Sequence, residues 1–210
     1  MRCFGIVLLV AFVQLFFLPT AAAAGIHNGS FESGTFGGWR TIGTMEIRSA
    51  GVGIEPPAGH SQALIESHSS VFGVAATRLV SFLGLSTAHL RKISTAHVID
   101  GSGMKQTLRV HAGDVLSFDW NFLTNEDEPD HANNDFAFVT ITPAILSVLA
   151  DTKSDLVEAT VPFKKYTTYH TFSHTFEKTG RFMLGIGVVD VGDNDVTSGL
   201  LIDNVRLTHK

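Results

Sequence analysis

The chain has a single cysteine, Cys3, so no disulfide can form within it. Positive charge is also scarce: 15 lysines and arginines stand against 20 aspartates and glutamates, for a formal net charge of -5. A mildly acidic chain of this kind does not bind nucleic acid or anionic lipid through bulk charge, and suits cations instead. A domain without disulfides must be held by its hydrophobic core, with or without the help of a metal ion.

The first 24 residues, MRCFGIVLLVAFVQLFFLPTAAAA, combine a basic start, a long apolar run and small residues at the end. This pattern predicts a secretory signal peptide over residues 1–24 with cleavage after Ala24, and the alternative is an uncleaved membrane anchor. Cleavage would also remove Cys3. We therefore expect a secreted protein, extracellular or periplasmic, with no later apolar run long enough to span a membrane.

Strand patterns dominate residues 25–210. In DVLSFDWNFLT the apolar side chains of Leu116, Phe118, Trp120 and Phe122 alternate with polar ones, which is the period of a half-buried strand. Further strands are expected in the segments GWRTIGTMEIRS, SQALIES, DFAFVTIT, TTYHTFSHTF, GRFMLGIGVVD and GLLIDNVRL. Several strands separated by turns predict one all-β domain, a β-sandwich, over residues 25–210.

One segment, roughly 74–94, has a helical spacing of apolar residues at Leu79, Phe82 and Leu83. Gly84 is placed as a C-cap, and Ser86 could cap a second short helix. We interpret the segment as a helical insertion between strands. An irregular surface loop is the alternative.

A lone carboxylate lies near each end of this domain: Glu32 in the glycine-rich NGSFESGTFGGW, and Asp203 within SGLLIDNVRL. Ca²⁺ takes six to eight oxygen ligands, commonly from carboxylates and backbone carbonyls together. If the two ends meet, Glu32 and Asp203 could share one structural calcium ion. The alternative is two separate surface acids.

The same two motifs resemble the bracketing motifs of galactose-binding-like jelly-roll domains, which include several carbohydrate-binding module families. The segments LSFDWNFLTNEDEPDHANNDFAFVTI and LGIGVVDVGDNDVTSGLLIDNVRL further resemble bacterial secreted proteins of the PEP-CTERM or choice-of-anchor type. The resemblance implies a jelly-roll sandwich. It also implies a structural calcium ion at Glu32 and Asp203, with backbone oxygens near Asn28 as further ligands. The chain departs from the anchored pattern, since LTHK follows the last strand directly, and we expect a released protein.

Two acidic loops form a second candidate cation site or polar ligand rim. NEDEPDHANND and DVGDNDVTS each lie at the edge of an expected central strand, and their dense Asp and Asn suit oxygen coordination. Solvated loop tips are the alternative. The candidate ligands are Asp127, Asp135, Asp190, Asp193 and Asp195.

Recognised catalytic and nucleotide-binding motifs are missing, including H-E-x-x-H, G-x-S-x-G and the P-loop. The ten histidines show no evident metal-ligand spacing. A glycosidase needs two carboxylates flanking a cleft. Asp119, Glu126 and Asp135 are available for that role, but nothing marks a pair among them.

Sugar binding uses aromatic surfaces with a few polar groups. The candidate ligand-binding residues are Trp39, Asp119, Asn121, Tyr166 and Tyr169. The sequence therefore favours a secreted, non-catalytic module that binds a polysaccharide or matrix glycan and is stabilised by calcium. A structural or adhesive protein with protein partners, and a glycoside hydrolase with an unrecognised carboxylate pair, are the alternatives.

Overall fold

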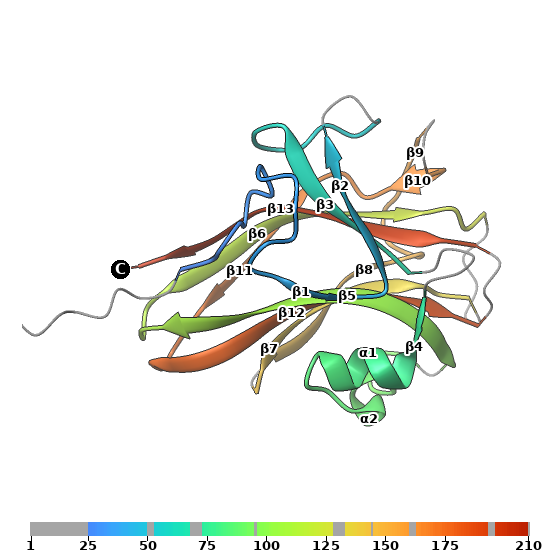
Figure 1. The fold of residues 1–210 in the computed structure, drawn as a ribbon. Coiled ribbons are helices and arrows are strands. Elements are labelled where there is room, and N and C mark those ends of the chain that lie inside the picture. The colour runs from blue at the N-terminus through green and yellow to red at the C-terminus, as the bar shows by residue number, and fades with distance from the viewer. Residues whose placement is uncertain are drawn as a thin grey trace, which may run out of the picture.

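The computed structural model describes residues 25–49, 53–67, 73–94, 96–127, 133–143, 145–159, 163–192 and 196–209. The expected signal peptide, residues 1–24, lies outside the described residues. Two antiparallel sheets stack face to face, with two short helices outside one of them (Figure 1). This arrangement confirms the all-β sandwich expected from the sequence.

The first sheet, sheet A, has the strand order β1-β5-β12-β7-β8, with β4 paired to β5. Its long central strands β5 and β12 pair antiparallel over most of their length. The members of sheet A are β1 (Arg40–Ile42), β4 (Val74–Ala75), β5 (Val98–Val110), β7 (Phe136–Thr142), β8 (Ile145–Asp151) and β12 (Gly180–Val191).

The second sheet, sheet B, has the order β2-β3-β13-β6-β10-β9, with β11 also paired to β6. Its central strands β13 and β6 pair antiparallel, with an irregularity between Asp203 and Arg206. The members of sheet B are β2 (Thr44–Ser49), β3 (Ser61–Glu66), β6 (Val115–Thr124), β9 (Val157–Glu158), β10 (Lys165–Tyr166), β11 (His170–Thr175) and β13 (Ser198–Thr208).

The main core lies between the sheets and follows the alternation seen in the sequence. Phe118, Trp120 and Phe122 of β6 all belong to it, together with Ile186 and Val188 of β12. Their neighbours along each strand consequently face outward. Residues such as Asp119 and Asp203 are thereby placed on the outer face of sheet B.

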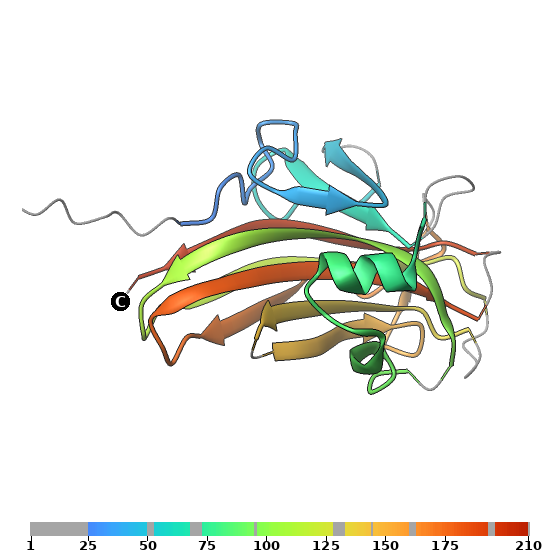
Figure 2. The ribbon, with the colours of Figure 1, turned by 60° about the horizontal axis from the view of Figure 1, so that its bottom comes forward.

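The helical insertion covers the outer face of sheet A and confirms the expected helices (Figure 2). Helix α1 (Ala76–Phe82) is followed by Gly84 in the left-handed region at φ 73°, and α2 (Thr87–Leu90) is capped by Ser86 with a reciprocal capping box. Among the described residues, no helix is long and apolar enough to cross a membrane.

Candidate functional site

A row of polar side chains crosses the outer face of sheet B. Asp203 of β13 pairs with Asp119 of β6, and Asp119 pairs on its other side with Thr171 of β11. Gln62 of β3 extends the row, because its neighbour Ala63 pairs with Ile202. Four strands thus bring residues from distant parts of the chain into one line.

Hydrogen bonds fix the orientation of this row. Thr171 Oγ1 donates to Asp119 Oδ1 at 2.6 Å, and Asn204 Nδ2 donates to Asp119 Oδ2 at 2.9 Å. The hydroxyl of Tyr169, in the connection before β11, donates to Gln62 Oε1. Burial raises the pKa of Tyr169, and the charges of Asp203 and Asp119 raise it further, so this hydroxyl stays a donor.

Part of the row is open to solvent. Gln62 and Asp203 are buried, whereas Asp119, Tyr169 and Asn204 are half-buried and Thr171 is exposed. We call the last four residues the polar patch. It offers a carboxylate, an amide and two hydroxyl groups, all on or beside strands of one sheet.

Glu32 and Asp203 meet at one short segment, residues 58–61. Glu32 Oε1 accepts from the backbone N–H groups of His60 and Ser61, each at 2.8 Å. Asp203 Oδ2 accepts from the N–H of Ala58 at 3.3 Å, and its Oδ1 accepts from Asn204 at 2.6 Å. The structure therefore brings together the two carboxylates that the terminal motifs single out.

The electrostatics of this place suit a cation. Burial raises the pKa of Asp203 to about 6, against the lowering effect of its N–H donors, and the charges of Glu32 and Asp119 raise it further. The N–H groups of His60 and Ser61 lower the pKa of Glu32. A carboxylate oxygen can accept more than one partner, so hard oxygen donors remain for an ion such as Ca²⁺.

Asn28 is held within the terminal loop by its own hydrogen bonds, and its part in a calcium site stays a prediction. Its side-chain amide donates to the carbonyl of Thr35 at 2.7 Å and its Oδ1 accepts from Ser33. Its backbone carbonyl accepts from Trp39 Nε1 at 3.2 Å. Asn28 thus organises the terminal loop that carries Glu32, with its side chain directed at the turn of residues 33–35.

The second acidic cluster is brought together only in part. Asp135 is buried and accepts from the N–H of Val191 at 2.8 Å and from Ser198 Oγ at 2.7 Å, which places it beside Asp190. Asp190 in turn pairs with the buried Asp100 of β5. Asp100 was missed in the sequence because it lies in a segment, DGSGMKQ, that has no strand alternation.

The remaining members of that cluster lie elsewhere or are not described. Asp127 is exposed and forms an ion pair with Lys164 at 2.6 Å. Asp193 and Asp195 lie outside the described residues. A cation at this cluster stays a prediction.

The candidate ligand-binding aromatics are largely covered. Trp39 is only 7% exposed and packs against Phe31 in the core. Tyr166 and Tyr169 are half-buried beside Phe163 on the outer face of sheet B. Asn121 is fully buried there, and its Oδ1 accepts from Thr167. Tyr169 and Asp119 alone among these candidates reach the polar patch.

Two of the carboxylates considered for a glycosidase, Asp119 and Asp135, lie in or beside different sheets. Asp119 lies on the outer face of sheet B, whereas Asp135 is buried at the start of β7 in sheet A. Asp203 has the raised pKa of a general acid, but it has no exposed surface with which to reach a substrate. Glycosidic cleavage needs two carboxylates on either side of the bond.

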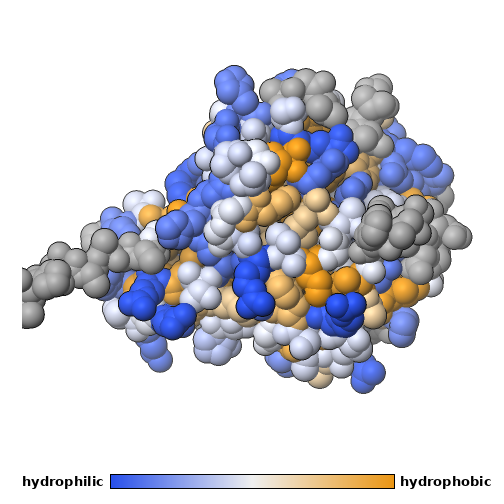
Figure 3. Space-filling model, viewed as in Figure 1, coloured by the Kyte–Doolittle hydropathy of each residue, from blue (hydrophilic) through white to orange (hydrophobic). Residues whose placement is uncertain are grey.

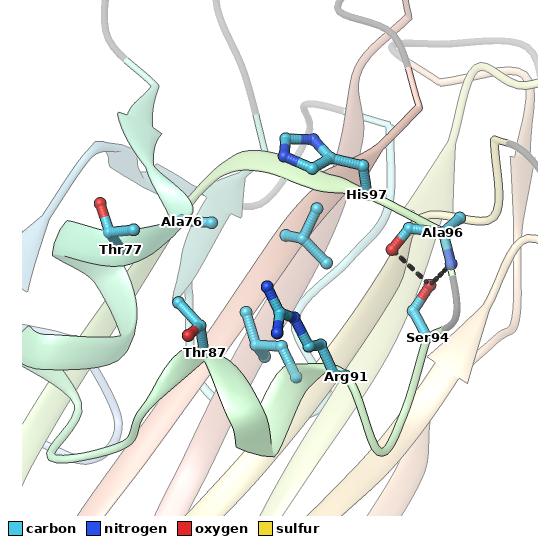
Figure 4. Close-up of a pocket in the computed structure, with 9 residues that line it drawn as sticks. Ala76, Thr77, Thr87, Arg91, Ser94, Ala96 and His97 are labelled. Carbon is cyan, nitrogen blue, oxygen red and sulfur yellow. Dashed lines mark hydrogen bonds between the residues drawn. The ribbon is translucent and has the colours of Figure 1, made fainter.

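A small pocket lies between the helical insertion and β5, where Arg91 and His97 border it (Figure 4). Its volume is about 180 Å³. Ser94 hydrogen-bonds the backbone of Ala96 at its rim. Typical small-molecule sites span roughly 300–1,000 Å³, so this pocket is small for such a ligand.

The surface of the sandwich mixes hydrophilic and hydrophobic residues on the side drawn in Figure 3. Among the described residues, the exposed large hydrophobic side chains are Val148 and Val157, on β8 and β9. These strands belong to different sheets. They give little support to an apolar contact surface of the kind that an adhesive protein would use.

No protein-family model and no curated protein matches the chain. Solved structures with a similar fold include TmCBM61 in complex with beta-1,4-galactotriose, with 14% identity, a TM-score of 0.46, and coverage of 87% of this chain and 96% of that one. The K1 cleaved adhesin domain of Lys-gingipain from Porphyromonas gingivalis W83 has 13% identity, a TM-score of 0.47, and coverage of 86% and 96%. The mannan-recognising module TmCBM27 has 16% identity, a TM-score of 0.43, and coverage of 88% and 95%. These likenesses are too distant to transfer a ligand to this chain.

Proposed function

We propose that this protein is a secreted, non-catalytic module that binds carbohydrate or extracellular matrix and is stabilised by calcium. The observation that carries the proposal is the polar patch of Asp119, Tyr169, Thr171 and Asn204. It lies on the sheet whose last strand holds Asp203, one of the two residues that the sequence resemblance singles out.

The chemistry of the patch fits a sugar. Sugar hydroxyls donate and accept hydrogen bonds, and the patch offers a carboxylate acceptor, hydroxyl groups and an amide. Asp119 and Thr171 lie on paired strands, so binding would require little ordering of the site.

Aromatic stacking would contribute less than in a site built on an open platform. Among the described residues, no Trp, Tyr or Phe side chain is fully exposed. Tyr169 is the aromatic residue of the patch, and its hydroxyl is held by Gln62. We therefore expect recognition to be mainly polar, with modest affinity for each sugar unit.

Calcium would bind between Glu32 and Asp203. The ion would neutralise the charge of Glu32, which raises the pKa of Asp203, and it would tie the terminal loop to the last strand. The ion would stabilise the fold and would take no part in a reaction. The secreted location rests on the expected signal peptide of residues 1–24.

The test is retention of the protein on a panel of soluble and insoluble polysaccharides, in calcium and in chelator, while released reducing sugar is assayed. We expect retention on at least one glycan with no sugar released. Sugar release would contradict the non-catalytic proposal. Absence of retention on every glycan would contradict carbohydrate binding and turn attention to protein partners in the matrix.

A further inference from the structure

Two histidines and a buried aspartate converge at the end of the sandwich where β5 turns into β6. His111 and Asp114 belong to that turn, and His209 follows the last residue of β13. Strand pairing of Thr208 with Val115 brings His209 to the turn. The nearest ligand atoms of the three side chains all lie within 4.8 Å of one another.

The distances between the ligand atoms of these three side chains are close to those around a bound metal ion. Asp114 Oδ2 is 3.0 Å from His209 Nδ1 and 3.8 Å from His111 Nδ1. Around a tetrahedral zinc ion, with bonds of about 2.0–2.1 Å, neighbouring ligand atoms are about 3.3 Å apart. Both imidazole rings are exposed, at 63% and 44%, so small side-chain rotations can bring them to that spacing.

The carboxylate is held ready for a cation. Asp114 is 2% exposed, and its Oδ2 accepts from the backbone N–H of His111 at 2.7 Å. Its backbone is fixed as well, because its carbonyl accepts from the N–H of Phe176 at 2.8 Å.

We propose that His111, Asp114 and His209 bind a borderline divalent metal ion, with Zn²⁺ as the best fit. Two imidazole nitrogens and one carboxylate oxygen favour zinc and its neighbours over calcium and magnesium. Three protein ligands leave the fourth position open on the solvent side. A bound ion would tie the end of β13 to the β5–β6 turn.

This site is separate from the calcium site at Glu32 and Asp203, and it does not depend on the proposed function. Among the described residues, it is the one place where three histidine, cysteine or acidic side chains gather this closely. The site could not be predicted from residue spacing, because His209 lies far from the HAGD turn along the chain.

The test is titration of Zn²⁺ into the chelator-treated, untagged chain by calorimetry. Cys3→Ser in every sample removes the one thiol. We expect one equivalent of bound zinc, and a fall in affinity of about tenfold or more in His111→Gln, His209→Gln and Asp114→Asn. Loss of a direct ligand costs at least as much as loss of an outer-shell partner. Asp114→Asn keeps an oxygen to accept from the His111 N–H.

His97→Gln is the matched control, an exposed histidine outside the cluster, and it should bind zinc as the parent does. Glu32→Ala should also leave zinc binding unchanged, which separates this site from the calcium site. Zinc should raise the melting temperature of the parent and of His97→Gln but not of His209→Gln. Absence of saturable zinc binding to the parent would overturn the proposal. So would an affinity for zinc in the three ligand variants that equals the affinity of the parent.

Discussion

Asp203 has no exposed surface, and its pKa is raised to about 6 from an ordinary value of 3.8. Between these two pH values, the folded protein holds a proton that the unfolded chain releases. In chelator, the contribution of Asp203 to stability is therefore present below pH 4 and is lost as the pH rises through 6. A shift of this size corresponds to a contribution on the order of 3 kcal/mol.

Calcium should change the sign of that dependence, because only the ionised carboxylate is a ligand. We predict that the difference in unfolding free energy between the parent and Asp203→Asn falls from pH 4 to 6 in chelator and rises over the same range in calcium. Urea unfolding at each pH measures it. Using the difference cancels the titration of other groups. A calcium-independent curve for the parent would contradict the calcium site.

Gly59 lies close to the side chain of Glu32. It has φ +66°, and an added Cβ would lie 2.4 Å from Glu32 Oε1. Gly34 has φ +67° with nothing within 4 Å of an added Cβ, so it is a matched control. Each change to alanine should cost about 1 kcal/mol from the left-handed backbone.

Gly59→Ala should cost more than Gly34→Ala, because it also displaces Glu32 from the N–H groups of His60 and Ser61. It should in addition weaken the effect of calcium on the melting temperature. Thermal melts in calcium and in chelator measure both. Equal losses in the two variants would show that Glu32 contributes nothing at this place.

At the scale of elements, the helical insertion depends on glycines in the sheet beneath it. Leu79 of α1 is fully buried over Gly101 and Gly103 of β5, where an added Cβ would lie 2.9 Å and 3.0 Å from its methyl carbons. Leu83 approaches Gly185 of β12 in the same way. The helix can lie this close to the sheet only because those strand positions have no side chain.

Leu79→Ala should therefore lower the unfolding free energy by about 2–5 kcal/mol, through lost burial and the cavity that remains. The exposed Arg78 on the same helix is the control, and Arg78→Ala should change stability by less than about 0.5 kcal/mol. Chemical denaturation measures both variants. A small effect of Leu79→Ala would mean that the insertion unfolds separately from the sandwich.

The same glycines explain which strands the sequence could predict. β6 and β13 were expected because their apolar residues alternate or run continuously into the core. β5 was missed because its start, VIDGSGMKQ, has no alternation of apolar and polar residues. Glycines in this segment leave room for close contact with α1. The short strands β4, β9 and β10 have only two residues each and depend on pairing with other strands: β4 pairs with β5, β10 with β6, and β9 with β10.

The candidate site was predictable only in part for a similar reason. Glu32 and Asp203 stood out as lone acids in the terminal motifs, and Asp119 stood out as a polar residue within an apolar strand. Gln62, Thr171 and Asn204 join them only through strand order and register, which local patterns do not encode. Burial of Trp39 likewise follows from its contact with Phe31 in the folded core.

At the scale of the whole molecule, the sandwich keeps its two outer faces distinct. The helical insertion covers sheet A, whereas sheet B presents the polar patch. Ligand binding should therefore respond to changes on sheet B and not to equivalent changes on sheet A. Thr171 on sheet B and Thr107 on sheet A are exposed strand threonines that allow a matched comparison.

Glycan recognition by the polar patch is tested most directly by the affinity of the parent, Thr171→Ala and Thr107→Ala for a polysaccharide that retains the parent. Thr171 Oγ1 donates to Asp119, so its loss frees that carboxylate and removes a hydroxyl from the patch. We predict weaker binding by about fivefold to tenfold for Thr171→Ala, consistent with about 1 kcal/mol for a hydrogen bond, and unchanged binding for Thr107→Ala. Equal affinities in all three proteins, or no glycan that retains the parent, would contradict glycan recognition by the polar patch of sheet B.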